Sequence, residues 1–106
     1  MYVRIVKLTF MNDFSKEAAS TLLVELGKTK GFAAGMLFRL SVDLSTTQRY
    51  SMTIWPDKAT KKKSWKLFGE EVLKKLRETG ARVEISRGPI NEIHFSKNLD
   101  LNNFLY

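Results

Sequence analysis

Cysteine is absent from this sequence of 106 residues, and histidine occurs only once, as His94. Without cysteine there can be no disulfides, thiolate metal sites or cysteine nucleophiles. A single histidine excludes a metal site built from several imidazoles. No apolar run approaches the roughly 20 residues of a membrane-spanning helix, and the start of the chain lacks the pattern of a signal peptide. We therefore expect a cytoplasmic protein without a metal, another cofactor or a membrane segment.

Positive charge is in excess, with 18 Lys and Arg against 11 Asp and Glu and a net charge of +7. Such a field can bind nucleic acid or another polyanion, with a steep loss of binding in salt. The sequence carries neither a helix-turn-helix nor the aromatic pattern of an RNA-recognition strand. A solvated helix face is therefore the favoured interpretation. Much of the excess falls in one predicted helix, at Lys58, Lys61, Lys62, Lys63, Lys66, Lys74, Lys75 and Arg77.

The apolar pattern predicts six regular elements, because alternation indicates strands and spacings of three or four indicate helices. Asp13 or Ser15 is expected to cap the first helix, and Gly80 to follow the second. Arg87-Gly88-Pro89 is expected to interrupt the last strand, with 92–95 as its continuation or a short fifth strand. The predicted order is strand 2–11, a helix ending at Gly31, strands 36–44 and 49–55, helix 57–79 and strand 82–86.

The junction Trp55-Pro56-Asp57 is the most informative local sequence. It follows an alternating strand, and proline cannot donate a hydrogen bond to a strand ladder. Asp57 is a preferred helix N-cap and stands directly before the basic helix. The third strand should therefore stop at this junction and the second helix should start there.

This order of elements predicts an α+β fold, a ferredoxin-like β-α-β-β-α-β sandwich with a four-stranded antiparallel sheet and both helices on one face. The other face would be open in a monomer. Val3 and Ile5 are expected on that face and are too apolar to remain in water. Two sheets packed face to face would cover them, so we expect a homodimer. The domain should span 1–96, and the apolar tail 97–106 should pack on its own subunit or on a partner.

Two short motifs carry a resemblance to a known family. Lys30-Gly31-Phe32-Ala33-Ala34-Gly35 enters the second strand, and Met52-Thr53-Ile54-Trp55-Pro56-Asp57-Lys58-Ala59 leaves the third. Over roughly 2–85 the chain resembles the antibiotic-biosynthesis-monooxygenase-like group of the dimeric α/β-barrel superfamily, although Ala59 comes one residue early for the group's pattern. The resemblance implies two subunits whose sheets join into a barrel, with a ligand cavity between each sheet and its helices.

The resemblance implies several activities. The group includes cofactor-independent quinone-forming oxygenases, heme-degrading oxygenases, small aldehyde or signal-metabolising enzymes and members without assigned activity. Heme degradation is disfavoured, because its members use an Asn, a Trp and a His, and only Trp65 has a counterpart here. We expect a small-molecule-binding homodimer resembling the oxygenases that act on aromatic or quinone-type substrates. A non-catalytic dimeric ligand-binding or assembly module is the alternative.

The candidate substrate-binding residues are aromatic, apolar or basic. Cofactor-independent oxygenation needs an apolar pocket, polar groups that orient a phenol and support for a developing oxyanion. Each candidate is equally well explained as an ordinary strand or helix residue, and no catalytic residue is assigned. His94 has no partner in the sequence and is interpreted as structural. The candidates for the walls are Tyr50, Met52, Trp65, Phe38 and Phe10, and those for the polar groups are Arg39, Arg49 and Ser51.

Three lysines indicate which class of ligand to expect. On a helical wheel Lys58, Lys61 and Lys62 continue the apolar stripe of Trp65, so the start of the second helix should be basic on its inward side. These lysines either extend past the end of the core or line the mouth of the cavity. They also lie near a helix N-terminus, which favours anions. We therefore hypothesise a cavity for an acidic or phenolate-bearing small molecule.

Overall fold

The computed structural model describes residues 1–100, apart from the side chains at positions 27 and 28. Four strands and two long helical segments follow one another in the predicted order. Each helical segment contains one π-helical turn, labelled η. The elements are β1 (Tyr2–Thr9), α1 (Asp13–Leu26), η1 (Gly27–Gly31), β2 (Phe38–Asp43), β3 (Gln48–Trp55), α2 (Lys58–Ser64), η2 (Trp65–Gly69), α3 (Glu70–Glu78) and β4 (Arg82–Pro89).

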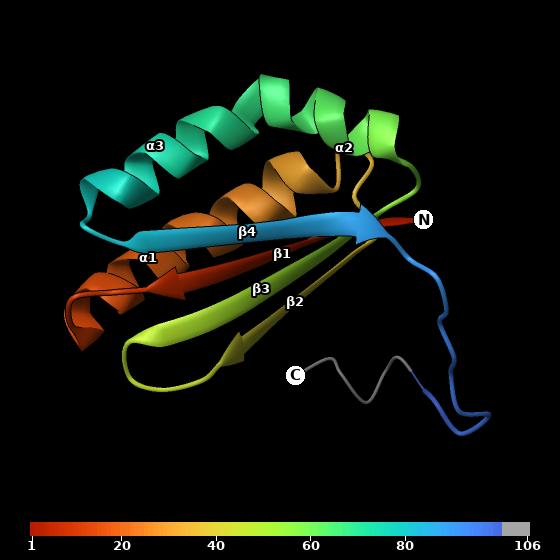
Figure 1. The fold of residues 1–106 in the computed structure, drawn as a ribbon, viewed down its shortest axis with the longest axis horizontal. Helices are drawn as coiled ribbons and strands as arrows, with labels where there is room; N and C mark the ends of the chain where they lie inside the picture. The colour runs from red at the N-terminus through yellow and green to blue at the C-terminus, as the bar shows by residue number, and fades with distance from the viewer. Residues whose placement is uncertain (101–106) are drawn as a thin grey trace.

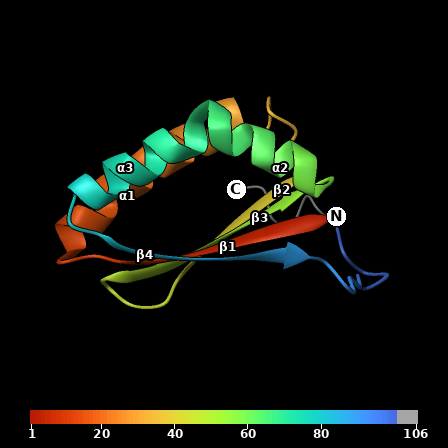
Figure 2. The same cartoon turned by 45° about the horizontal axis from the view of Figure 1, so that its top comes forward.

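The four strands form one antiparallel sheet in the order β2-β3-β1-β4. Both helical segments lie against the same face of this sheet, and the opposite face carries no helix (Figures 1 and 2). This arrangement is the ferredoxin-like sandwich, so the predicted fold class is confirmed. Of the central strands, β1 belongs to the first strand-helix-strand unit of the chain and β3 to the second, and their pairing holds the two units together.

Strand alternation divides the sheet residues between the two faces. The residues facing the helices include Leu8 and Trp55, which are the largest fully buried side chains of the described chain. The open face carries three rows of cross-strand neighbours, and most members of these rows are apolar. The rows are Phe38–Ile54–Val3–Gly88, Leu40–Met52–Ile5–Ser86 and Val42–Tyr50–Lys7–Glu84.

The hydrophobic core lies where β1 meets the helices. Leu8 and Phe10 from β1 and the residue after it pack with Ala19 of α1 and Leu76 of α3. Ala81, which precedes β4, completes this buried cluster. The core therefore occupies one end of the layer between sheet and helices. Side chains outside this cluster occupy the other end.

The junction between β3 and α2 behaves as predicted. β3 ends at Trp55, directly before Pro56, and α2 begins at Lys58. The Asp57 carboxylate accepts a hydrogen bond of 2.7 Å from the backbone N–H of Thr60. This bond satisfies one of the N–H groups that the first helical turn leaves unpaired.

Replacing Asp57 with alanine is expected to lower Tm by about 5 °C at neutral pH. The backbone N–H of Thr60 holds the pKa of Asp57 below its ordinary value. The cap therefore stabilises the fold fully above the ordinary pKa of about 3.9, and this stabilisation is lost as pH falls through the lower folded pKa. Thermal melts between pH 2 and 7 should show the difference from wild type disappearing in acid. Asp57→Asn is the matched control, because it keeps an acceptor and should lose little at pH 7.

Two predicted boundaries are wrong. Asn12, rather than Asp13 or Ser15, caps α1: its Oδ1 accepts a hydrogen bond of 2.8 Å from the backbone N–H of Ser15. Asp13 is the first residue of α1, whereas an N-cap is the residue directly before the first helical one. β4 also runs without interruption to Pro89, because it is an edge strand and needs hydrogen-bonding partners on one side only.

After Pro89 the chain leaves the sandwich (Figure 1). Residues 90–100 contain no strand, so the suggested continuation or fifth strand over 92–95 is wrong. Phe95 and Ile93 of this arm are exposed. Most of the predicted tail, residues 101–106, lies outside the described residues. Over residues 1–100, no helix is both long and apolar enough to cross a membrane.

Candidate functional site

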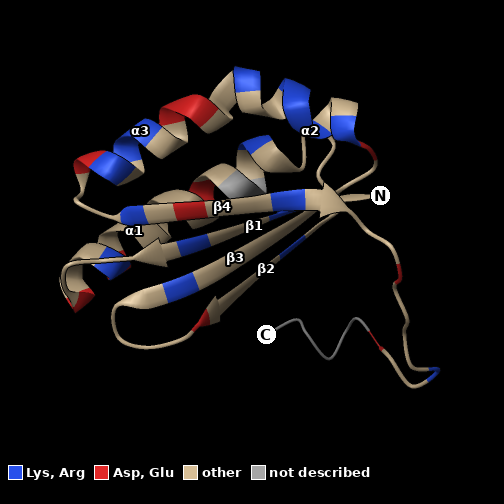
Figure 3. Ribbon diagram, viewed as in Figure 1, with Lys and Arg blue, Asp and Glu red and all other residues tan. Residues whose placement is uncertain are grey.

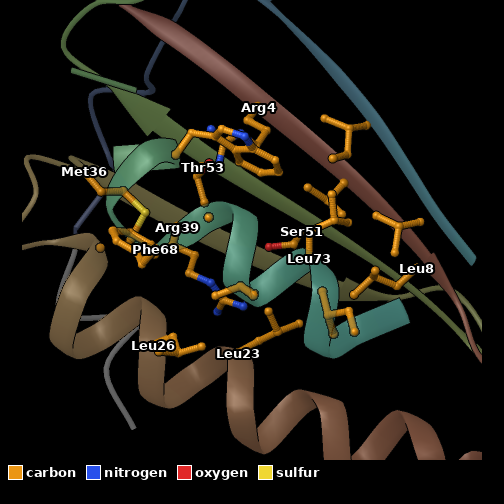
Figure 4. A pocket seen from close by; sticks show the side chains of 18 of the residues that line it. Arg4, Leu8, Leu23, Leu26, Met36, Arg39, Ser51, Thr53, Phe68 and Leu73 are labelled. Atoms are coloured by element: carbon orange, nitrogen blue, oxygen red, sulfur yellow. The ribbon is translucent and has the colours of Figure 1, made fainter. Parts of the chain in front are cut away.

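A cavity of about 120 Å³ lies between the sheet and the helical segments (Figure 4). Its floor comes from β1, β2, β3 and β4, and its roof from α1, η2 and α3. Most of the lining is apolar, and no Asp, Glu or His takes part among the described residues. The lining residues are Arg4, Val6, Leu8, Leu23, Leu26, Gly31, Met36, Arg39, Ser51, Thr53, Trp55, Trp65, Phe68, Gly69, Val72, Leu73, Leu76, Val83 and Ile85.

Trp65 forms the aromatic wall of the cavity, and Gly69 makes room for its ring. The two residues are four apart along the helical segment and therefore share a face. A Cβ atom at Gly69 would lie 2.5 Å from Cε3 of Trp65, closer than any real contact of that kind. The absence of a side chain at position 69 thus allows the indole to lie flat against the helix.

Arg4 brings a buried positive charge to the wall opposite. It lies on β1 and faces the helices, and only 9% of its surface is exposed. The carbon at the centre of its guanidinium lies 4.8 Å from the centre of the Trp65 ring, within the range of a cation–π interaction. Its Nε and Nη2 atoms are buried and have no hydrogen-bond partner among the described residues.

A second arginine enters the same cavity from the edge of the sheet. Arg39 of β2 and Arg4 of β1 both pair with Thr53 of β3, so the three residues form one cross-strand row. Figure 4 shows both arginines reaching into the pocket. Burial lowers the pKa of Arg39, and Arg49 lowers it further. Burial also lowers the pKa of Arg4, with a smaller contribution from its cross-strand neighbour Arg87.

Lys61 adds a third cation near Arg4. It is 5% exposed, and its Nζ lies 5.2 Å from the centre of the Tyr2 ring. Burial lowers the pKa of Lys61, and the charges of Arg4 and Arg87 lower it further. One end of the layer between sheet and helices is therefore strongly positive.

Of the three lysines expected on the inward side, only Lys61 is buried. Lys58 and Lys62 are exposed, although Figure 3 shows basic residues gathered along α2 as predicted. In an α-helix successive residues are about 100° apart. Measured from Lys61, Lys58 and Lys62 therefore lie about 60° and 100° round the helix on the same side, toward the edge of the inward stripe. Both side chains are exposed, so the prediction that they face inward is wrong.

The other sequence-predicted residues divide between three places. Trp65 and Arg39 line the cavity, as does Ser51, and Phe10 belongs to the adjacent core. The prediction that Tyr50, Met52 and Phe38 form walls of the same cavity is wrong. The sheet register places these three on the open face, where Tyr50 and Met52 help to line a separate shallow groove.

Arg49 and His94 take no part in the cavity. Arg49 hydrogen-bonds to Ser20 and to Asp43, whose carboxylate lies 2.9 Å from Arg49 and 3.4 Å from Lys16. His94 is exposed, 3.4 Å from Glu92. Within residues 1–100 there is no group of acidic or histidine residues that could hold a metal ion.

Arg4 is the main site residue that the sequence prediction missed. A signal was available, because Arg4, Val6 and Leu8 alternate along the first strand and therefore share a face. A charged residue on the helix-covered face of a central strand is rare without a partner. Met36 and Thr53, which also line the cavity, carry no comparable signal.

No protein-family model matches this sequence, and no curated protein does. Solved structures do match it. A dimeric ferredoxin-like protein from an uncultured marine organism is 13% identical, with a TM-score of 0.74 over 91% of this chain and 100% of that one. A proposed antibiotic biosynthesis monooxygenase from Deinococcus radiodurans is 16% identical, with a TM-score of 0.77 over 92% of this chain and 100% of that one.

A third match is SnoaB, a cofactor-independent oxygenase from Streptomyces nogalater. It is 11% identical, with a TM-score of 0.67 over 87% of this chain and 94% of that one. The chain shares their ferredoxin-like fold. The structural likeness agrees with the family resemblance found in the sequence, and at these identities it concerns the fold alone.

Proposed function

We propose that this protein is a homodimer that binds a small aromatic molecule between sheet and helices and oxygenates it without a cofactor. The observation that carries the proposal is the cavity itself, whose apolar lining is interrupted by Trp65, Arg4 and Arg39. An assembly module would need no such space, and its layers could pack shut with large side chains. The similarity to a cofactor-independent oxygenase supports the same reading.

The chemistry requires little from the protein. A phenol with hydrogen at its para carbon reacts with O₂ to give a para-quinone and water, and the substrate itself supplies the electrons. Loss of the phenolic proton makes the ring more electron-rich, and the positive charge of Arg39 favours the resulting oxyanion. The apolar walls keep bulk water away from the reacting ring.

The homodimer would form through the open face of the sheet. Phe38, Leu40 and Val42 of β2 are exposed there, next to half-buried Met52 and Ile5. Such an apolar patch is a typical protein-binding surface. A second copy of the chain is the occupant that we propose, because similar structures are described as dimeric. The exposed apolar residues of the arm after Pro89 would then pack on the partner subunit.

A non-catalytic ligand-binding dimer is the second candidate. It is favoured by one observation, the absence of a carboxylate or imidazole from the described lining of the cavity. Such a group is the usual general base for removing a phenolic proton. Both candidates predict that the protein binds a small aromatic molecule, and only the first predicts that this molecule is oxygenated.

Oxygen uptake in the presence of phenol, a substrate with one ring, tests the proposal. The wild-type protein should convert it to 1,4-benzoquinone with one oxygen atom from ¹⁸O₂, and Trp65→Leu should lower the rate at least about tenfold. Leu67→Ala, on the exposed side of the same helical segment, is the matched control and should keep the wild-type rate. Binding without quinone formation would support the non-catalytic candidate, and absence of binding would refute both.

A further inference from the structure

The two unpartnered nitrogens of Arg4 lie on the same edge of its guanidinium. Nε–H and Nη2–H point in nearly parallel directions and form the side-on fork that binds a carboxylate through two hydrogen bonds. Both atoms are buried, and neither has a hydrogen-bond partner among residues 1–100. The Trp65 ring covers one face of the same guanidinium and thereby restricts its orientation.

The charge around Arg4 has no counterion in the described chain. A guanidinium stays protonated even when buried, so Arg4 cannot become neutral by losing a proton. Its charged neighbours Arg87 and Lys61 carry the same sign. None of the ion pairs formed by the described residues includes Arg4, Arg39, Arg87 or Lys61. A buried charge is costly unless it is paired, so the missing anion should come from a ligand.

Carboxylate fits this site better than other anionic groups. A phenolate offers one oxygen to a fork with two donors, and a phenol with a pKa near 10 is mostly neutral at pH 7. A carboxylate offers two oxygens at the right separation and is ionised at that pH. Beyond the fork the walls are apolar, including Phe68 and Leu73. The rest of the ligand should therefore be apolar.

The size of the cavity limits the ligand to about one ring. The space is about 120 Å³, and a dry cavity of roughly 150 Å³ accommodates benzene. We propose that the cavity binds a monocyclic aromatic carboxylate, with its carboxylate on the Nε–Nη2 edge of Arg4 and its ring among the apolar walls. This inference rests on the proposed function, and it adds the substrate class and the residue that selects it.

Calorimetric titration with benzoate and with benzyl alcohol, its neutral analogue, tests the assignment. Wild-type protein in low-chloride buffer at pH 7 should bind benzoate at least about tenfold more tightly than benzyl alcohol. Arg4→Met should lose at least about tenfold in benzoate affinity and keep its affinity for benzyl alcohol. Arg4→Lys keeps the charge but lacks the fork, so its affinity for benzoate should fall between that of the wild type and that of Arg4→Met.

Arg82→Met is the matched control. Arg82 is also a strand arginine, but its side chain is 78% exposed and lies 3.3 Å from Glu84. This variant should bind both compounds as the wild type does. Melting curves of each variant verify that it is folded before the titrations are compared.

The remaining outcomes separate the two proposals. If the wild type binds benzyl alcohol as tightly as benzoate, or if Arg4→Met keeps the wild-type preference, the carboxylate site is refuted and aromatic binding stands. If Arg4→Lys equals the wild type, the role of the fork is refuted. Displacement of benzoate by millimolar chloride would identify a site for inorganic anions and would also refute the assignment. If neither compound binds, the proposed function fails as well.

Discussion

Replacing Arg4 with methionine should make the ligand-free protein more stable, by about 2 kcal/mol in free energy of unfolding. The wild-type guanidinium is buried, with two nitrogens that lack hydrogen-bond partners among the described residues. Methionine is also long and flexible, so it can fill the same space beside Trp65 without a charge. Urea denaturation at one fixed protein concentration measures the effect, because the stability of a dimer depends on concentration.

Arg82→Met again provides the control, because the replacement of an exposed arginine should change stability by less than about 0.5 kcal/mol. Saturating benzoate should reduce the difference in free energy of unfolding between the wild type and Arg4→Met, because the ligand stabilises the protein that binds it more tightly. A ligand-free Arg4→Met protein less stable than the wild type would mean that Arg4 contributes more to packing than its unpaired charge costs.

Replacing Met52 with aspartate should convert the proposed dimer into a monomer. Met52 lies in the middle of the open face, paired with Leu40 on one side and Ile5 on the other. A carboxylate at that point would be buried without a partner between two sheets. We expect the dissociation constant of the dimer to rise at least about 100-fold. Size-exclusion chromatography with light scattering at micromolar concentration measures the change in mass.

Lys66→Asp is the control for this experiment. Lys66 is exposed in η2, on the side of the molecule away from the open face, so the change in charge should leave the mass unchanged. A wild-type protein that is monomeric at these concentrations would refute the proposed dimer. A Met52→Asp protein that stays dimeric would place the interface elsewhere.

The fold could be predicted from the sequence because its signals are local. The alternation of residues 49–55, the proline after Trp55 and the cap at Asp57 each determine one boundary without reference to the rest of the chain. The cap of the first helix was missed for a related reason. Asn12, Asp13 and Ser15 are all good capping residues, and only the position of the first helical turn selects among them.

The site was predicted less well, because its position depends on which face of the sheet the helices cover. Both faces of the hairpin strands carry residues suited to a pocket, so Tyr50 and Met52 were as plausible as Ser51 and Thr53. A shift of one residue exchanges the two faces of a strand. The inward position of Trp65 could be predicted because a helix has one inward stripe, and its phase can be read from neighbouring apolar residues. Contact of Trp65 with a ligand stays a prediction.

The π-helical turn Trp65–Gly69 has a consequence for how this chain could change in length. A π turn contains one residue more than the α-helical turn that it replaces. Deleting one residue between Trp65 and Gly69 could therefore yield a continuous α-helix without breaking the chain of backbone hydrogen bonds. Gly69 would then follow Trp65 by three positions, and the space for the indole would be lost. Among homologues, an alignment gap of one residue at this turn would mark proteins that keep the fold and lack the aromatic wall.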